Sequence, residues 1–116
     1  MIDFNLSNEE KIKLIKQAKI QLYKNESLIK LFYKKDNSER LLVLKNERDN
    51  LYYYVIEKLI IFNDEQLKKV NEGYPDVVYG GWQQQDNGYG YSVFESLDHL
   101  LSEIKPNLIF YNEESF

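Results

Sequence analysis

The sequence contains no cysteine, which excludes disulfide bonds and thiolate metal sites. Proline, glycine and histidine are also scarce, with two, five and one residues among 116. The longest apolar stretch, residues 51–62, is interrupted by Glu57 and Lys58 and is too short to cross a bilayer, so we expect no membrane partner. The first residues lack the basic region and apolar run of a signal peptide. A cytoplasmic location is therefore expected.

The composition is that of a folded protein, with 43% hydrophobic, 15% aromatic and 29% charged residues. A chain of this length has the usual size of one domain and buries about two-thirds of the surface that its unfolded form exposes. We therefore expect a single domain over residues 1–116.

Charge is distributed unevenly along the chain, whose formal net charge is −4. Residues 1–60 hold 12 basic and 9 acidic residues, whereas residues 61–116 hold 3 and 10, which gives +3 and −7. An acidic half disfavours nucleic acid and favours a protein partner with a basic surface. The alternative is that net charge serves only solubility.

The N-terminal third predicts an amphipathic helix over residues 8–24, which begins with the capping box of Ser7 and Glu10. Its expected buried face consists of Ile12, Leu14, Ile15, Ala18 and Leu22.

Three segments after this helix, residues 28–33, 41–45 and 51–62, are rich in β-branched, aromatic and leucine residues. Turn-forming residues separate them, so an antiparallel three-stranded meander is expected. Residues 28–33 alternate imperfectly, and an extension of the first helix stays open for them.

The C-terminal half predicts two helices, a hairpin and a last strand. Asp64 is the expected cap of a short helix, and Ser96 the cap of a later helix that Pro106 ends. Between them, residues 77–83 and 89–94 suggest a hairpin, and residues 108–111 a final strand. The expected fold class is α+β: a mainly antiparallel, twisted sheet with the N-terminal amphipathic helix and further helices packed on one face.

No catalytic, cofactor-binding or metal-binding residues are predicted, and we expect a protein that is not an enzyme. His99 would stand in a helical row with Glu95 and Glu103, but a solvated helix face explains this spacing better than a metal site without a second histidine. Ser92 does not complete a nucleophile-elbow motif, and the glycine pairs complete no phosphate-binding loop.

The most unusual segment is 73–91, which holds all five glycines, the single tryptophan and four tyrosines. Such residues supply large contact areas and adaptable polar groups, as interfaces do. The competing interpretation is a hairpin whose aromatic residues cover the core. The candidate partner-binding residues are Tyr74, Asp76, Tyr79, Trp82, Gln84, Asp86, Tyr89 and Tyr91.

The runs Val-Val-Tyr-Gly-Gly-Trp at 77–82 and Tyr-Ser-Val-Phe-Glu-Ser-Leu at 91–97 resemble bacterial immunity proteins, the cytoplasmic antidotes to polymorphic or contact-dependent toxins. The resemblance implies an inhibitor that binds a cognate toxin domain, often a nuclease with a basic cleft, and that needs no catalytic residues or cofactor. Two alternatives remain: a small enzyme or ligand-binding domain with a cleft near Trp82, and a phage-encoded accessory structural protein that forms homo-oligomers through an exposed strand.

Overall fold

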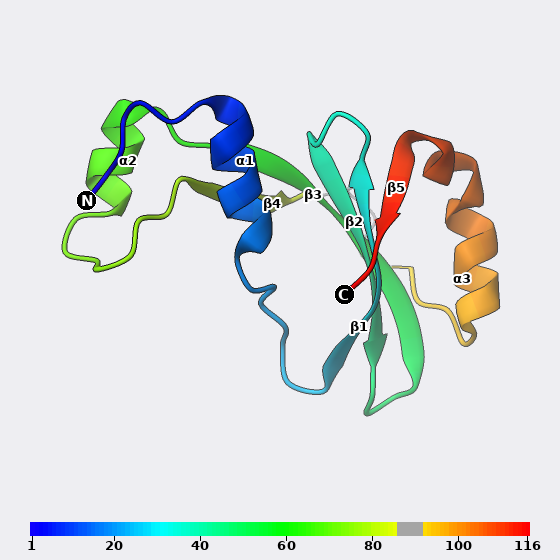
Figure 1. Ribbon diagram of the computed structural model, residues 1–116. Coiled ribbons are helices and arrows are strands. Elements are labelled where there is room, and N and C mark those ends of the chain that lie inside the picture. The colour runs from blue at the N-terminus through cyan, green and yellow to red at the C-terminus, as the bar shows by residue number, and fades with distance from the viewer. Residues whose placement is uncertain (86–91) are drawn as a thin grey trace. The chain divides into compact units, whose positions relative to one another are not determined.

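The computed structural model describes residues 1–85 and 92–116. In this described part of the chain, five strands form one sheet in the order β4-β3-β2-β1-β5, and three α-helices and a 3₁₀ helix, η1, accompany it (Figure 1). The expected α+β class with an antiparallel sheet is confirmed. In chain order the elements are α1 (Asn8–Gln17), β1 (Glu26–Lys34), β2 (Glu39–Asn46), β3 (Leu51–Ile61), α2 (Asp64–Val70), β4 (Gly80–Gln84), α3 (Leu97–Ile104), η1 (Lys105–Phe110) and β5 (Tyr111–Glu114).

The chain divides into two compact units. The first, here called the α1–α2 unit, comprises Met1–Ile20 and Leu59–Gln83. The second, the sheet unit, comprises Gln21–Lys58 and Gln84–Phe116. The prediction of a single domain over residues 1–116 stays a prediction.

The sheet unit contains the expected meander, since β2 pairs antiparallel with both β1 and β3. Residues 28–33, which the sequence left open between helix and strand, belong to β1. Asn37 and Asn50 take positive φ angles of 64° and 55° in the two connecting turns, a conformation that asparagine tolerates better than most residues.

Helix α3 packs on one face of this meander. Ser96 caps it by accepting a hydrogen bond from the His99 backbone N–H at 3.2 Å, as predicted. The apolar side of the helix meets the sheet. The buried residues of this core are Phe32, Leu41 and Val43 from the strands with Leu100 and Ile104 from α3. This face fixes the position of the α3 residues that line the groove described below.

Helix α1 is shorter than predicted. The capping box of Ser7 and Glu10 is present, but the helix ends at Gln17, and Ala18 has extended backbone angles of φ −63° and ψ 140°. Residues 18–24 contain neither proline nor glycine, so the sequence offers no stop signal there. Of the predicted apolar face, Ile15 is buried and Ile12 is half-buried, but Leu14, Ala18 and Leu22 are exposed. The predicted face is therefore wrong at Leu14 within the helix and at Ala18 and Leu22 beyond its end.

The predicted hairpin is wrong in its described part. Strand β4 lies along β3, where the Phe62 N–H donates to the Tyr79 carbonyl at 3.0 Å and the Gln85 N–H to the Ile56 carbonyl at 2.8 Å. Phe94 then pairs with Tyr52, also on β3, and does not form a second hairpin strand with β4. The expected Asp-Asn-Gly turn and residues 89–91 lie outside the described residues. The long strand β3 provides backbone hydrogen-bond partners for both segments. This pairing prevails over the local turn signal that predicted the hairpin.

Two boundaries differ for local reasons. Asn63, rather than Asp64, caps α2, because its side chain and that of Gln66 bond reciprocally to each other's backbone N–H groups. The last strand begins at Tyr111, three residues later than predicted, because Pro106 stands in the first turn of η1, which continues to Phe110.

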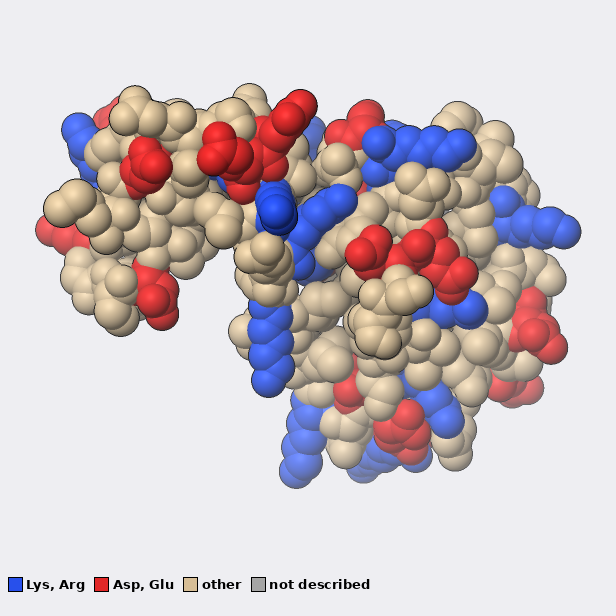
Figure 2. All heavy atoms as spheres, viewed as in Figure 1, with Lys and Arg blue, Asp and Glu red and all other residues tan. Residues whose placement is uncertain are grey.

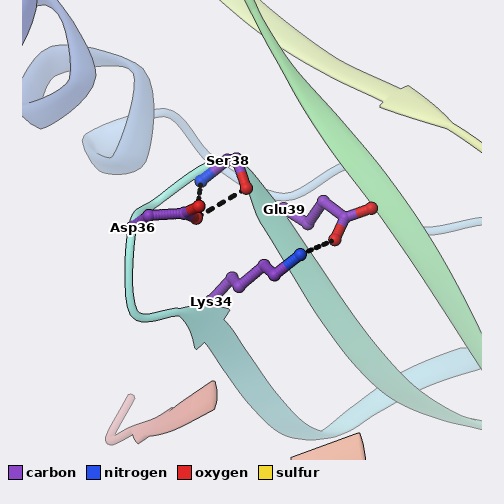
Figure 3. A network of polar contacts seen from close by, with 4 residues as sticks. All are labelled: Lys34, Asp36, Ser38 and Glu39. Atoms are coloured by element: carbon purple, nitrogen blue, oxygen red, sulfur yellow. Dashed lines mark hydrogen bonds and ion pairs between the residues drawn. The ribbon is translucent and has the colours of Figure 1, made fainter. Parts of the chain in front are cut away.

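The β1–β2 turn is held by local polar contacts (Figure 3). Lys34 and Glu39 form an ion pair of 3.0 Å across the ends of the two strands. Within the turn, the Asp36 carboxylate accepts hydrogen bonds from the Ser38 backbone N–H at 2.9 Å and from its hydroxyl at 2.6 Å. These bonds to the charged form lower the pKa of Asp36 below its usual value.

We expect the pKa of Asp36 to rise towards its usual value in Ser38→Ala, because the hydroxyl is the first cause of the depression. Because the pKa of Asp36 is lower in the folded than in the unfolded state, its ionised form stabilises the turn at pH values above the unfolded pKa. This stabilisation is lost as the pH falls through the folded pKa. The pKa of Asp36 is measured from the NMR chemical shift of its carboxyl group during an acid titration. An unchanged pKa of Asp36 in the variant would show that the Ser38 hydroxyl does not lower it.

Candidate functional site

Exposed apolar side chains gather around the C-terminal end of α2 in the α1–α2 unit. We call Phe4, Val70, Tyr74 and Val78 the α2 surface; all four are exposed, Tyr74 to 71%. Large apolar residues in such numbers on so small a unit are typical of an interaction surface.

Asn71 provides a framework for the α2 surface. Its buried side-chain amide donates to the Leu67 and Val78 carbonyls, both at 2.9 Å, while its side-chain oxygen accepts from the Val78 N–H at 2.6 Å. These bonds hold the backbone of Val78 against Asn71, the residue that follows Val70 in the chain. The Tyr74 N–H donates to the Asn71 carbonyl at 3.2 Å, and Gly73 takes the φ of 79° that this turn requires.

The N-terminal segment completes the surface. The Asp3 N–H donates to the Tyr79 hydroxyl at 3.1 Å, which holds this segment against the chain leading into β4. Phe4 follows directly, and the Lys68 ammonium of α2 lies 5.6 Å from the centroid of its ring. The α2 surface is therefore built from two segments far apart in the sequence and joined by specific contacts.

The structure places the predicted partner-binding residues in different environments. Tyr74 and Asp76 are exposed in the turn after α2, as an interface requires. Tyr79 is only 8% exposed, so its assignment to a surface is wrong: its ring is packed and its hydroxyl is bonded. Trp82 is half-buried in β4, and Gln84 is exposed but belongs to the sheet unit. Asp86, Tyr89 and Tyr91 lie outside the described residues.

Sequence reasoning missed Phe4, Val70 and Val78. In the sequence, Val70 and Val78 resemble ordinary core positions of a helix and a strand, but both are exposed. Phe4 precedes the first capping box in a segment without periodicity. No local pattern marks these residues as exposed.

The histidine row does not form. Glu95 precedes the cap residue Ser96, so it is outside α3 and its spacing to His99 is not helical. His99 lies 3.9 Å from Glu103 and packs edge-on against Phe94, with ring centroids 5.1 Å apart. Within residues 1–85 and 92–116, no group of three histidine or acidic side chains is arranged to hold a metal ion.

The sheet unit carries an open groove of about 520 Å³ beside α3. One wall is a face of α3 and its C-terminal continuation, where the spacing of Asp98, Leu101, Ser102 and Lys105 brings the four side chains to one side of the helix. The other residues that line it are Lys30, Phe32, Leu108 and Glu113, of which Lys30 and Glu113 form an ion pair of 2.9 Å. An apolar floor with charged walls suits a polypeptide better than a small apolar ligand.

Charge is shared between the two units. The α1–α2 unit has 6 basic and 7 acidic residues, and the sheet unit 9 and 12, so the acidic half of the sequence does not form one acidic unit. Figure 2 shows basic and acidic groups side by side over the visible face. Any electrostatic attraction for a partner must therefore come from local groups of acids.

Comparisons with family models, curated proteins and solved structures found no match to this chain. None of the helices in the described part of the chain has the length and apolar character needed to span a membrane. The candidate sites therefore rest on the geometry of the chain itself.

Proposed function

We propose that this protein acts by binding and neutralising another protein, as an immunity protein does for a cognate bacterial toxin domain with a basic surface. The observation that carries the proposal is the α2 surface, where exposed apolar side chains are held by the bonds of Asn71. A pre-formed apolar surface lowers the entropy cost of association. The resemblance of residues 77–82 and 91–97 to immunity proteins supports the same function.

Tyr74 is the expected anchor of this surface. Its side chain is large and has few rotatable bonds, and it stands at the centre of the turn that Asn71 and Gly73 fix. Two exposed acids, Glu72 and Asp76, lie two residues before and after it in the chain. Their charge accelerates encounter with a basic partner, while the apolar contact slows dissociation.

The alternative of a ligand-binding domain is favoured by one observation, the groove beside α3. Its lining does not include Trp82, and the expected cleft near that residue stays a prediction. The groove holds two lysines and two acids in an open setting, which argues for a polypeptide ligand.

Tyr74→Ala should weaken the complex with the product of the adjacent toxin gene by about 2 kcal/mol, roughly 30-fold in Kd, chiefly through faster dissociation. Tyr23→Ala is the matched control, because Tyr23 is another tyrosine exposed to 84%, in the sheet unit. Binding kinetics of the purified proteins, together with protection of cells that express the toxin, provide the measurement.

Equal affinity of the Tyr74→Ala and Tyr23→Ala variants would place the interface elsewhere. Failure of any neighbouring gene product to bind the parent protein would remove the immunity function itself. Trp82→Ala is a weaker test, because Trp82 is half-buried and its loss would also affect folding.

A further inference from the structure

Strand β5 forms one edge of the sheet in the described part of the chain. It pairs antiparallel with β1, and no other described strand pairs with its second side (Figure 1). Three of its four residues are exposed. A strand in this position presents backbone groups that another chain can use.

The direction of these groups follows from the register. The Lys35 N–H donates to the Phe110 carbonyl at 2.9 Å, which continues the β1–β5 pairing by one residue. In an antiparallel ladder, hydrogen-bonded pairs alternate with pairs that are not bonded. Asn112 and Glu114 therefore bond towards β1, whereas the N–H and C=O of Glu113 point away from it, towards the second side of β5.

The groove beside α3 lies on the same side of the sheet as the Glu113 side chain. Glu113 stands opposite Phe32 in the ladder, and both line the groove together with Leu101. A strand added to β5 would place every second side chain above this apolar floor. A strand added to β5 would thus gain both backbone hydrogen bonds and side-chain contacts.

The charge of β5 selects the occupant. The strand carries Glu113 and Glu114 and no basic residue. A second copy of this chain, paired through β5, would bring four acids together, which opposes self-association. Glu113 already pairs with Lys30 on the groove side, so lysine or arginine residues that alternate along an added segment would pair with Glu114 on the other side of the sheet.

We propose that the β5 edge is a second interaction surface, which accepts an extended, basic segment of another protein as a sixth strand. Every second side chain of this segment would lie in the groove beside α3. The proposal does not depend on the α2 surface or on the toxin-neutralising function.

The test uses the full chain and a blocked seven-residue peptide that alternates valine and lysine. Glu113→Pro removes the outward N–H and leaves the bonds to β1, because proline is tolerated at an edge position whose N–H faces away. Glu113→Ala is the matched control, since it removes the same charge but keeps the N–H. We expect Glu113→Pro to bind the peptide about tenfold more weakly than Glu113→Ala, because proline lacks the backbone N–H and its ring occupies the place of that hydrogen.

Two measurements on the parent protein complete the test independently of how the proline variant folds. The Glu113 amide should exchange with solvent more slowly when the peptide is bound, while those of Asn112 and Glu114 change little. A peptide N-methylated at each valine and lysine should not bind. Unchanged exchange at Glu113, equal binding of the methylated peptide, or no binding of the parent peptide would each overturn the proposal.

Discussion

Replacing Gly80 with alanine should lower the free energy of unfolding by about 3 kcal/mol, at the upper end of what overpacking costs. Gly80 is buried at the start of β4, and a Cβ placed there would collide with the backbone carbonyl oxygen of Ile60. It would also stand 2.7 Å from the Ile15 Cδ1 atom. The side chain of Ile15 can turn away, but the backbone of a paired strand cannot, so β3 and β4 would have to separate.

Gly81 is the matched control for this substitution. It is the next residue of the same strand, yet a Cβ there would meet no atom within 4 Å. We expect Gly81→Ala to change stability by less than about 0.5 kcal/mol. Urea denaturation followed by far-UV circular dichroism compares the two variants. If Gly80→Ala and Gly81→Ala unfold at the same urea concentration, the close approach of β4 to β3 is wrong.

Much of the fold was predictable because its signals are local. Ser7 with Glu10 and Ser96 each cap a helix through bonds that reach only three residues ahead. Turn residues between apolar runs likewise predicted the meander, and asparagines occupy the positions that need positive φ. Such features need no knowledge of distant residues.

The errors arise where distant segments compete for the same backbone. The turn signal at 86–88 favoured a hairpin, but Gln85 and Phe94 both pair with β3, at Ile56 and Tyr52. No local pattern in the sequence states that two segments will pair with the same distant strand.

The candidate site was predictable in part for the same reason. Tyr74 and Asp76 follow a helix-ending glycine, so their exposure could be expected. Tyr79 could not be told from them by composition, because the contact to its hydroxyl comes from Asp3, 76 residues away in the sequence. The core interpretation of this segment holds for Tyr79, whereas the interface interpretation of the exposed Tyr74 and Asp76 stays a prediction.

Replacing Leu100 with alanine should lower the free energy of unfolding by about 3–4 kcal/mol, because it opens a cavity in a close-packed core. Leu100 is 0% exposed between α3 and the sheet, where Phe32 and Val43 surround it. Leu22→Ala is the control in the same unit, since Leu22 is 43% exposed. This variant should lose less than about 1 kcal/mol.

The same variant tests whether residues 1–116 unfold as one domain. Leu100 belongs to the sheet unit, whereas Trp82, the single tryptophan, belongs to the α1–α2 unit. In a cooperative domain, all probes report one transition. Leu100→Ala should then shift the urea midpoint of Trp82 fluorescence as far as that of circular dichroism. A fluorescence midpoint that stays at its parental value would mean that the α1–α2 unit unfolds by itself, and the prediction of a single domain would be wrong.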